Sequence, residues 1–587
     1  MNRLITGQTN NKRVRAEHCF WREAIIILIL TAAMISPAQA QYHAGHQTQT
    51  AQTPVDLTKT MPPPRLMTGI GDSAIKVTTT SAEAQAYFNQ GLRHLHGFWD
   101  FESLRAFRHA ARLDPQMAMA HWGIYKAIGF SRHLQAEKLA ALAKAEELSR
   151  GAGDYERSFI AAYVALEDKN RGAKAFVAEM ETIIDRHPED IEARLFLAYY
   201  LMKGYDADER PKENQIYVRQ LLANILTTHP NSAAAHHYWI HGIETSPRPA
   251  DALESAEKLP RLAPRSGHLV HMPGHIYNRV GDYQKAHEAF VAAVRVDEEY
   301  MQSEKVAPAE NWNYAHNMSY LVANLAEAGR YREGLRWAEK LKSIPAAASR
   351  AEKTARFLKF EGGTLARFYV RFGEWQRVTD ETLSLGVDEA QTSEFTRRYR
   401  DGILQYARGM AAAQENNLKA AETQADLLER LQRQTETAER DPNDYHSLDV
   451  PKILLVAALE LRGEILSRAG RHDEAIKTLT EAARKELELG YFEPPIYSRP
   501  ALETLGAAHL RAKDYDQAEK AFAAALVLRP NNGFALDGLA RTHAAKGDRA
   551  QAEKYYRLLL KKWANADKDL PLMQTAVKWL AENGRSV

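Results

Sequence analysis

Residues 505–530 read LGAAHLRAKDYDQAEKAFAAALVLRP, and this pattern of small, aromatic and helix-forming residues returns after a fixed interval. Gly506 and Ala540 are 34 residues apart, and so are Ala518 and Ala552. The same skeleton occurs upstream, at 274–293, 409–425 and 463–482. Apolar residues recur at spacings of three and four, which is typical of amphipathic helices. The sequence therefore predicts an array of repeated helical hairpins.

The period and its small and aromatic positions resemble the tetratricopeptide repeat (TPR). In such a hairpin a small residue such as Gly274 lets two helices approach closely, and Phe290 fills the space beside it. Gly281 in the turn permits the reversal of the backbone. A hairpin cannot bury its apolar face alone, so successive hairpins stack. The resemblance implies an all-α fold, a TPR-type α-solenoid in which antiparallel helix pairs form a right-handed superhelix.

Composition sets the broad class of the protein. Of the 587 residues, 45% are hydrophobic and 26% are charged, which is ordinary for globular proteins. A chain of this length is too long for a single hydrophobic core. A net charge of +2 argues against a nucleic-acid partner, because phosphate binding needs a basic surface. The predicted organisation is a signal peptide (1–40), a flexible lead-in (41–82), irregular repeats (84–232), histidine-rich repeats (233–348), C-terminal repeats (349–566) and a capping helix or tail (567–587).

The first forty residues have the three parts of a secretory signal peptide. Basic residues precede the apolar run 24–35, and Ala38-Gln39-Ala40 ends the segment. The run is shorter than the roughly 20 residues that span a bilayer, so we expect no membrane span after cleavage. Cys19, the only cysteine, leaves with this segment, so the mature chain has no thiol. We expect export to the periplasm, with secretion as the alternative.

Histidine is concentrated in one part of the chain. Nine of the 22 histidines lie between His229 and His316. His237 and His271 are 34 residues apart, and so are His241 and His275. Each pair therefore occupies equivalent places in adjacent repeats.

The TPR resemblance implies that positions 2, 5, 9 and 12 of each inner helix line a concave groove. Spacings of three, four and seven residues place side chains on one helix face, which agrees with this implication. The candidate ligand-binding residues are His237, His241, Glu244, His268, His271, His275, His316, Asn317 and Glu493.

Imidazole pairs at i and i+4 favour a divalent metal ion such as zinc. The metal hypothesis places the ion on His237, His241, His271 and His275. Three histidines with a carboxylate would hold a catalytic ion with an open position, where bound water is activated. General acid–base catalysis and capture of an anionic ligand or peptide carboxylate are alternatives. Two further interpretations give the histidines no chemical role. They are polar residues on a solvated surface, or repeat duplication copied them for unrelated reasons. The H-E-x-x-H motif is absent from the sequence.

Longer strings resemble a family of bacterial exported TPR proteins with an H-L-V-H-M-P-x-H-I-Y signature. They are GHLVHMPGHIYNRVGDY (267–283), HHYWIHGIETSPRPADAL (236–253), and the segments 89–129 and 489–522. The resemblance implies a shared groove but no named reaction. Pro273 predicts a kink or break between His271 and His275, or alternatively a helix that begins at Pro273. Glu493 lies in a rigid connector, and its reach depends on the curvature of the array.

Two functions from different classes follow. The first is an exported scaffold that binds a peptide, a protein or a small ligand in its groove. The alternative is a metal-dependent enzyme whose ligands are His and Glu side chains on the superhelix. Self-association through the terminal repeats is a third interpretation.

Overall fold

The structure, a computed structural model, describes residues 56–129, 134–345, 358, 363–384, 393–440 and 447–583. Within these ranges the chain is helical and contains no β-strand; one isolated bridge joins Tyr205 and Pro211. The prediction of an all-α fold is confirmed. The predicted signal peptide lies outside the described residues, as do residues 41–55 of the predicted lead-in and 584–587 of the predicted tail.

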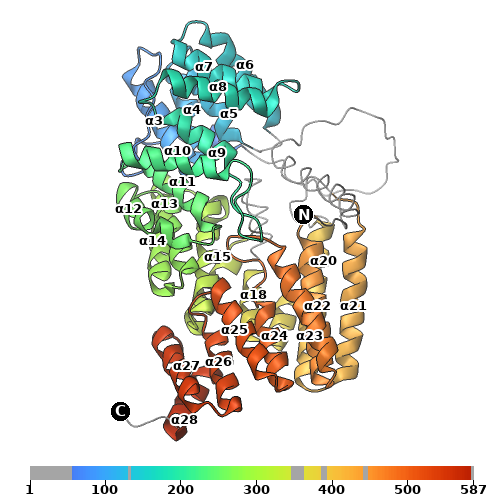
Figure 1. The fold of residues 1–587 in the computed structure, drawn as a ribbon. Helices are drawn as coiled ribbons and strands as arrows, with labels where there is room; N and C mark the ends of the chain where they lie inside the picture. The colour runs from blue at the N-terminus through green and yellow to red at the C-terminus, as the bar shows by residue number, and fades with distance from the viewer. Residues whose placement is uncertain are drawn as a thin grey trace, which may run out of the picture. The chain divides into compact units, whose positions relative to one another are not determined.

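The helices follow one another along the chain, and most of the links between them are short (Figure 1). The first group is α2 (Leu57–Thr60), α3 (Ala82–His96), α4 (Asp100–Leu113), α5 (Ala118–Ile128), α6 (Gln135–Ser149), α7 (Asp154–Glu167), α8 (Gly172–Arg186), α9 (Glu192–Leu201) and α10 (Gln215–Thr228). The middle group is α11 (Ala233–Glu244), α12 (Leu253–Leu262), α13 (Gly267–Arg279), α14 (Tyr283–Glu304), α15 (Trp312–Glu327) and α16 (Tyr331–Lys342).

The C-terminal group is α18 (Thr364–Phe372), α19 (Trp375–Ser384), α20 (Glu394–Gln414), α21 (Leu418–Glu436), α22 (Val450–Arg468), α23 (His472–Leu487), α24 (Ala501–Arg511), α25 (Tyr515–Leu528), α26 (Gly533–Lys546), α27 (Arg549–Lys562) and α28 (Pro571–Asn583). Two 3₁₀ turns occupy Pro249–Ala252 and Pro308–Glu310. None of the described helices has the length and apolarity needed to cross a membrane.

Each helix packs against the next, and alternate helices also touch, as α11, α13 and α15 do. This stacking of hairpins is that of an α-solenoid, as predicted. The contacts described below lie within the larger of two compact units, which holds residues 54–438 and 448–587.

Small residues set the helix spacing as the repeat pattern predicted. A methyl group on Gly274 would lie 2.3 Å from the ring of Phe290, and one on Gly506 would lie 2.8 Å from Phe522. Both distances are too short for a real Cβ, so glycine is needed where an aromatic ring from the second helix crosses the first. Gly281 has φ +75°, which confirms its predicted role in the turn.

The described part of the predicted flexible lead-in is held against the helices. Ile70, Ile75 and Val77 are buried. The backbone carbonyl of Gly69 accepts a hydrogen bond from the N–H of Arg265 at 2.7 Å, and Asp72 accepts one from the first residue of α11. Burial and these bonds hold parts of residues 64–81 against the helices.

The C-terminal repeats contact the middle repeats directly. Asn531 donates a hydrogen bond to the carbonyl of Gly281 at 3.0 Å, and Asp567 N–H donates to the carbonyl of Gly329 at 3.0 Å. The Trp563 ring lies against Gly329. Segments more than 230 residues apart are thereby brought together.

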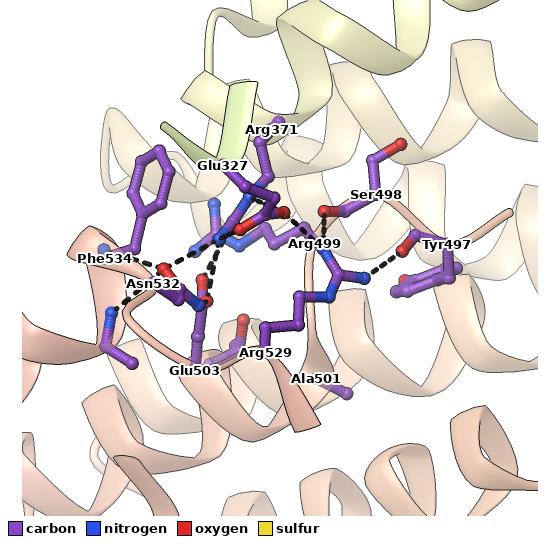
Figure 2. Close-up of polar contacts among 12 residues, drawn as sticks. Glu327, Arg371, Tyr497, Ser498, Arg499, Ala501, Glu503, Arg529, Asn532 and Phe534 are labelled. Carbon is purple, nitrogen blue, oxygen red and sulfur yellow. Dashed lines mark hydrogen bonds and ion pairs between the residues drawn. The ribbon is translucent and has the colours of Figure 1, made fainter. Parts of the chain in front are cut away.

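A buried ionic network strengthens this contact (Figure 2). Arg371 of α18 pairs with Glu327 of α15 at 2.9 Å and with Glu503 of α24 at 2.7 Å. Arg529 binds Glu327 as well, and it donates to the carbonyls of Tyr497 and Ser498. Those carbonyls belong to residues 488–500, called the connector below, which link α23 to α24. The network therefore fixes the segment that carries Glu493.

Candidate functional site

The predicted histidines meet where α11, α13 and α15 pack side by side (Figure 1). We call the six residues His237, His241, His268, His271, His275 and His316 the histidine cluster. Their rings form a continuous set of contacts with centroids 4.5–6.3 Å apart. The equivalent repeat positions therefore do converge.

The histidine cluster lies in the interior. His237, His271 and His275 have no exposed surface, and His268 is 3% exposed. These four side chains are therefore not solvated surface residues, because the connector and the α3–α4 link cover them. Phe98 of that link places its ring 4.5 Å from His237 and 5.5 Å from His268.

Pro273 leaves α13 unbroken. The helix runs from Gly267 to Arg279 with Pro273 inside it, so the predicted break and the predicted start at Pro273 are both wrong. Proline removes a single hydrogen bond of the ladder, and the remaining bonds hold the helix together. His268, His271 and His275 consequently share one helical face.

The first of two groups in the cluster, called group A, consists of His237, His241 and His268. One ring nitrogen from each residue lies within 4.8 Å of the others. His237 Nδ1 donates to the carbonyl of His96 at 2.6 Å, and His241 Nδ1 donates to Glu244 Oε1 at 2.7 Å. These bonds assign the proton to Nδ1 and leave a lone pair on each Nε2. Neither Nε2 has a hydrogen-bond partner among the described residues.

His268 has no hydrogen bond at either ring nitrogen within the described part of the chain. Burial, together with the neighbouring His237 and His241, lowers its pKa well below the ordinary value, and burial likewise lowers the pKa of His237. Both imidazoles are therefore neutral at pH 7. Three imidazoles that face one another are a ligand set for a transition-metal ion, which binds each ring at a nitrogen without a proton.

Group B consists of His271, His275 and His316, again with ring nitrogens within 4.8 Å. The Nε2 atoms of His271 and His275 are 2.5 Å apart, and His275 Nδ1 donates to Glu244 Oε2 at 2.7 Å. The four metal ligands of the sequence hypothesis thus divide between two groups, since His237 and His241 join His268, and His271 and His275 join His316.

Glu244 links the two groups, because one carboxylate oxygen accepts from His241 and the other from His275. Tyr491 of the connector donates a third bond to it at 3.0 Å. Burial opposes ionisation of Glu244, but the adjacent His241 and His275 outweigh it and lower its pKa. Glu244 in turn raises the pKa of His241 against the effect of burial.

Glu493 reaches the cluster, a point that the sequence left open. Its oxygens lie 4.0 Å from His241 Nδ1 and 3.9 Å from His275 Nδ1. Burial and the neighbouring Glu244 raise its pKa to about 7. The candidate residue Asn317 is not part of the histidine cluster. Its side-chain amide donates a hydrogen bond to the buried carboxylate of Asp297 at 2.6 Å.

Sequence reasoning missed three residues that shape the site: His96, Phe98 and Tyr491. All three come from segments 139 or more residues away from their partners in the site, so repeat spacing carries no information on them. The only signal was that both segments, 89–129 and 489–522, carry the wider family resemblance.

Comparisons with known proteins support the repeat assignment at the C-terminal end. Two tetratricopeptide repeat models match residues 500–532 and 535–568, which correspond to α24 with α25 and α26 with α27. The predicted tetratricopeptide repeats are confirmed there. A search of curated proteins gives no match.

Among solved structures, a human IFIT1 dimer with m7Gppp-AAAA is similar at 12% identity. The match covers 84% of this chain and 92% of that one, with a TM-score of 0.31. Yeast Tom70 is similar at 13% identity, over 85% of this chain and 95% of that one, with a TM-score of 0.26.

Proposed function

We propose that this chain is a helical-repeat protein that binds a transition-metal ion at group A. The observation that carries the proposal is the set of buried Nε2 lone pairs on His237 and His241 beside the unpartnered ring of His268. Leaving such groups buried without a partner costs about 1–3 kcal/mol each, and coordination would remove that cost.

The surroundings of group A match those of metal-ligating histidines. Such histidines donate their second ring N–H to a carboxylate or a carbonyl, which fixes the tautomer. Glu244 and the His96 carbonyl serve His241 and His237 in this way. Nitrogens bound at about 2.1 Å to one tetrahedral ion are about 3.4 Å apart, so small ring rotations suffice to bring these atoms together.

Imidazole ligands favour zinc, copper or nickel over calcium or magnesium. Three protein ligands would leave one position for water or a substrate, which is the arrangement of catalytic zinc sites. A metal-dependent enzyme is therefore the more specific version of this metal-binding proposal.

Metal analysis of the mature protein, purified without a His-tag, tests the proposal. We expect at least one ion per chain in wild type, and its loss from the group A position in His237→Ala and His268→Gln. His229→Ala, at an exposed histidine outside the cluster, is the matched control. Wild-type protein that stays metal-free after incubation with Zn²⁺ or Cu²⁺ would rule out the proposal.

The tetratricopeptide repeats at 500–568 favour a second role, as a scaffold for a protein or peptide partner. Affinity capture from periplasmic extract with the full chain tests it, with circular dichroism to show that the chain is folded. Recovery of a specific partner is the expected result, and a folded chain that captures none would contradict it.

We also propose export to the periplasm, on the basis of residues 1–40. N-terminal sequencing of protein from the periplasmic fraction is expected to begin at Gln41. An N-terminus at Met1 in cytoplasmic protein would contradict export.

A further inference from the structure

Group B repeats the chemistry of group A on the other side of Glu244. His271 and His275 have no exposed surface, and His316 is 5% exposed. The three rings are in mutual contact, at 4.5 Å between His271 and His275 and 4.7 Å between His271 and His316. A buried trio of imidazoles is therefore present a second time.

The tautomer of His275 is the one that a metal ligand needs. His275 Nδ1 lies 2.7 Å from Glu244 Oε2, and a carboxylate oxygen accepts, so the proton of His275 is on Nδ1 and the lone pair is on Nε2. This Nε2 accepts a hydrogen bond from His271 Nε2 at 2.5 Å, which leaves the lone pair of His271 on its Nδ1. The Nδ1 of His271 is buried and has no partner in the described part of the chain.

Groups A and B adjoin each other. The ring of His268 in group A lies 5.8 Å from that of His271 in group B, nearly parallel at 20°. It lies 6.3 Å from the ring of His316. Two ions held by these groups would be near neighbours.

Two buried cations require negative charge close by. Glu244 supplies it to both groups, because it lies 2.7 Å from one histidine of each. Glu493 lies 3.9–4.0 Å from the same two histidines. Glu244 and Glu493 thus lie close to both groups, whereas each group has three imidazoles of its own.

We propose that group B binds a second transition-metal ion, so that the histidine cluster holds a pair of ions with three imidazoles each. The inference rests on the proposed function of group A. Glu244 would orient one ligand of each ion. Zn²⁺ and Cu²⁺ are the probes, since both accept imidazole nitrogen.

The test is a titration of tag-free mature protein with each ion, with stoichiometry from calorimetry and elemental analysis. We expect two ions per chain in wild type and one in His237→Ala or in His316→Ala. His316→Gln repeats the second measurement with a side chain closer in volume, and His229→Ala should keep two. Circular dichroism of each variant confirms that it is folded.

Electron paramagnetic resonance of the Cu²⁺-loaded protein tests proximity. Two neighbouring Cu²⁺ ions couple, so wild type should give a broadened or silent signal, and His316→Ala the signal of an isolated ion. One ion per chain, lost in His237→Ala and kept in His316→Ala, would overturn the second site and leave group A standing. A single ion lost in both variants would also overturn it, because one ion would then be shared. No bound ion in wild type would remove both proposals.

Discussion

His268 places an entire imidazole in the protein interior with no hydrogen bond to a described residue. A neutral ring is tolerated there, but a protonated one is not, because a buried charge without a partner is strongly unfavourable. Protonation is equally unfavourable for His237 and His271, because burial lowers the pKa values of these histidines, like that of His268, well below 6.5. Each of these residues therefore links the stability of the fold to pH.

The first prediction concerns the metal-free protein in acid. These three histidines bind protons in the unfolded chain below about pH 6.5 but stay neutral in the folded one, so stability is lost as pH falls through that value. The slope is at most about 1.4 kcal/mol per pH unit for each histidine. His241, whose pKa is raised, opposes the loss in part. Thermal melts between pH 7.5 and 5 should show the decline, and His268→Phe should flatten it.

The second prediction concerns Glu244, which fixes one ligand in each group. Glu244→Gln keeps the size of the side chain but removes the negative charge that holds the two Nδ1 protons. Loss of such an outer partner typically weakens metal binding about 10- to 100-fold. Competition with a chelator measures the change. Glu257→Gln, at an exposed acid on α12, should bind metal as wild type does.

At the scale of the helix, glycine and aromatic pairs determine how closely α13 and α14 approach. The ring of Phe290 occupies the space that a Cβ on Gly274 would need. It also lies 4.9 Å from the ring of His271, so the packing of the hairpin and the position of a cluster residue are coupled. A change at Gly274 should therefore affect both.

The third prediction is that Gly274→Ala destabilises the protein by about 1–3 kcal/mol, the usual cost of overpacking a core. Denaturant unfolding measures it, and Phe290→Leu in the same chain should restore part of the loss. Gly151→Ala is the control, because the nearest atom to the new Cβ, the carbonyl oxygen of Leu148, would lie at an ordinary contact distance of 3.7 Å. Equal stability of Gly274→Ala and wild type would refute the packing argument.

The sequence predicted the hairpins and the convergence of the histidines because both follow from a local period. His237 and His271 occupy equivalent places one repeat apart, and stacking then brings α11 beside α13. The depth of the cluster did not follow, since Phe98 and the connector cover it from distant parts of the chain. The division into groups A and B also depends on the hydrogen bonds that Glu244 accepts from one histidine of α11 and one of α13. Repeat spacing does not encode these bonds.

At the scale of the molecule, Arg371 joins three helices that are far apart in sequence (Figure 2). It is fully buried, pairs with Glu327 and Glu503, and lies over the ring of Phe534 at 3.9 Å. Removing it would leave two carboxylates buried without their common partner.

The fourth prediction is that Arg371→Met costs about 3–5 kcal/mol of stability, as expected when one partner of a buried ion pair is removed. It should also weaken metal binding, because the network holds the connector that carries Tyr491 and Glu493. Chemical denaturation and metal titration measure the two effects. Lys546→Met, at an exposed pair with Asp516, should change neither quantity.

The bonds from Asn531 to Gly281 and from Asp567 to Gly329 have a consequence for how the chain unfolds. Repeat arrays whose units touch only their neighbours can fray from either end and tolerate the removal of terminal units. Here the C-terminal repeats are hydrogen-bonded to the middle repeats, so the C-terminal repeats cannot unfold without exposing the surface of the middle repeats that they cover. Cooperativity should accordingly extend over the joined repeats, and shortening the array at its C-terminus would cost far more than the removed hairpins alone.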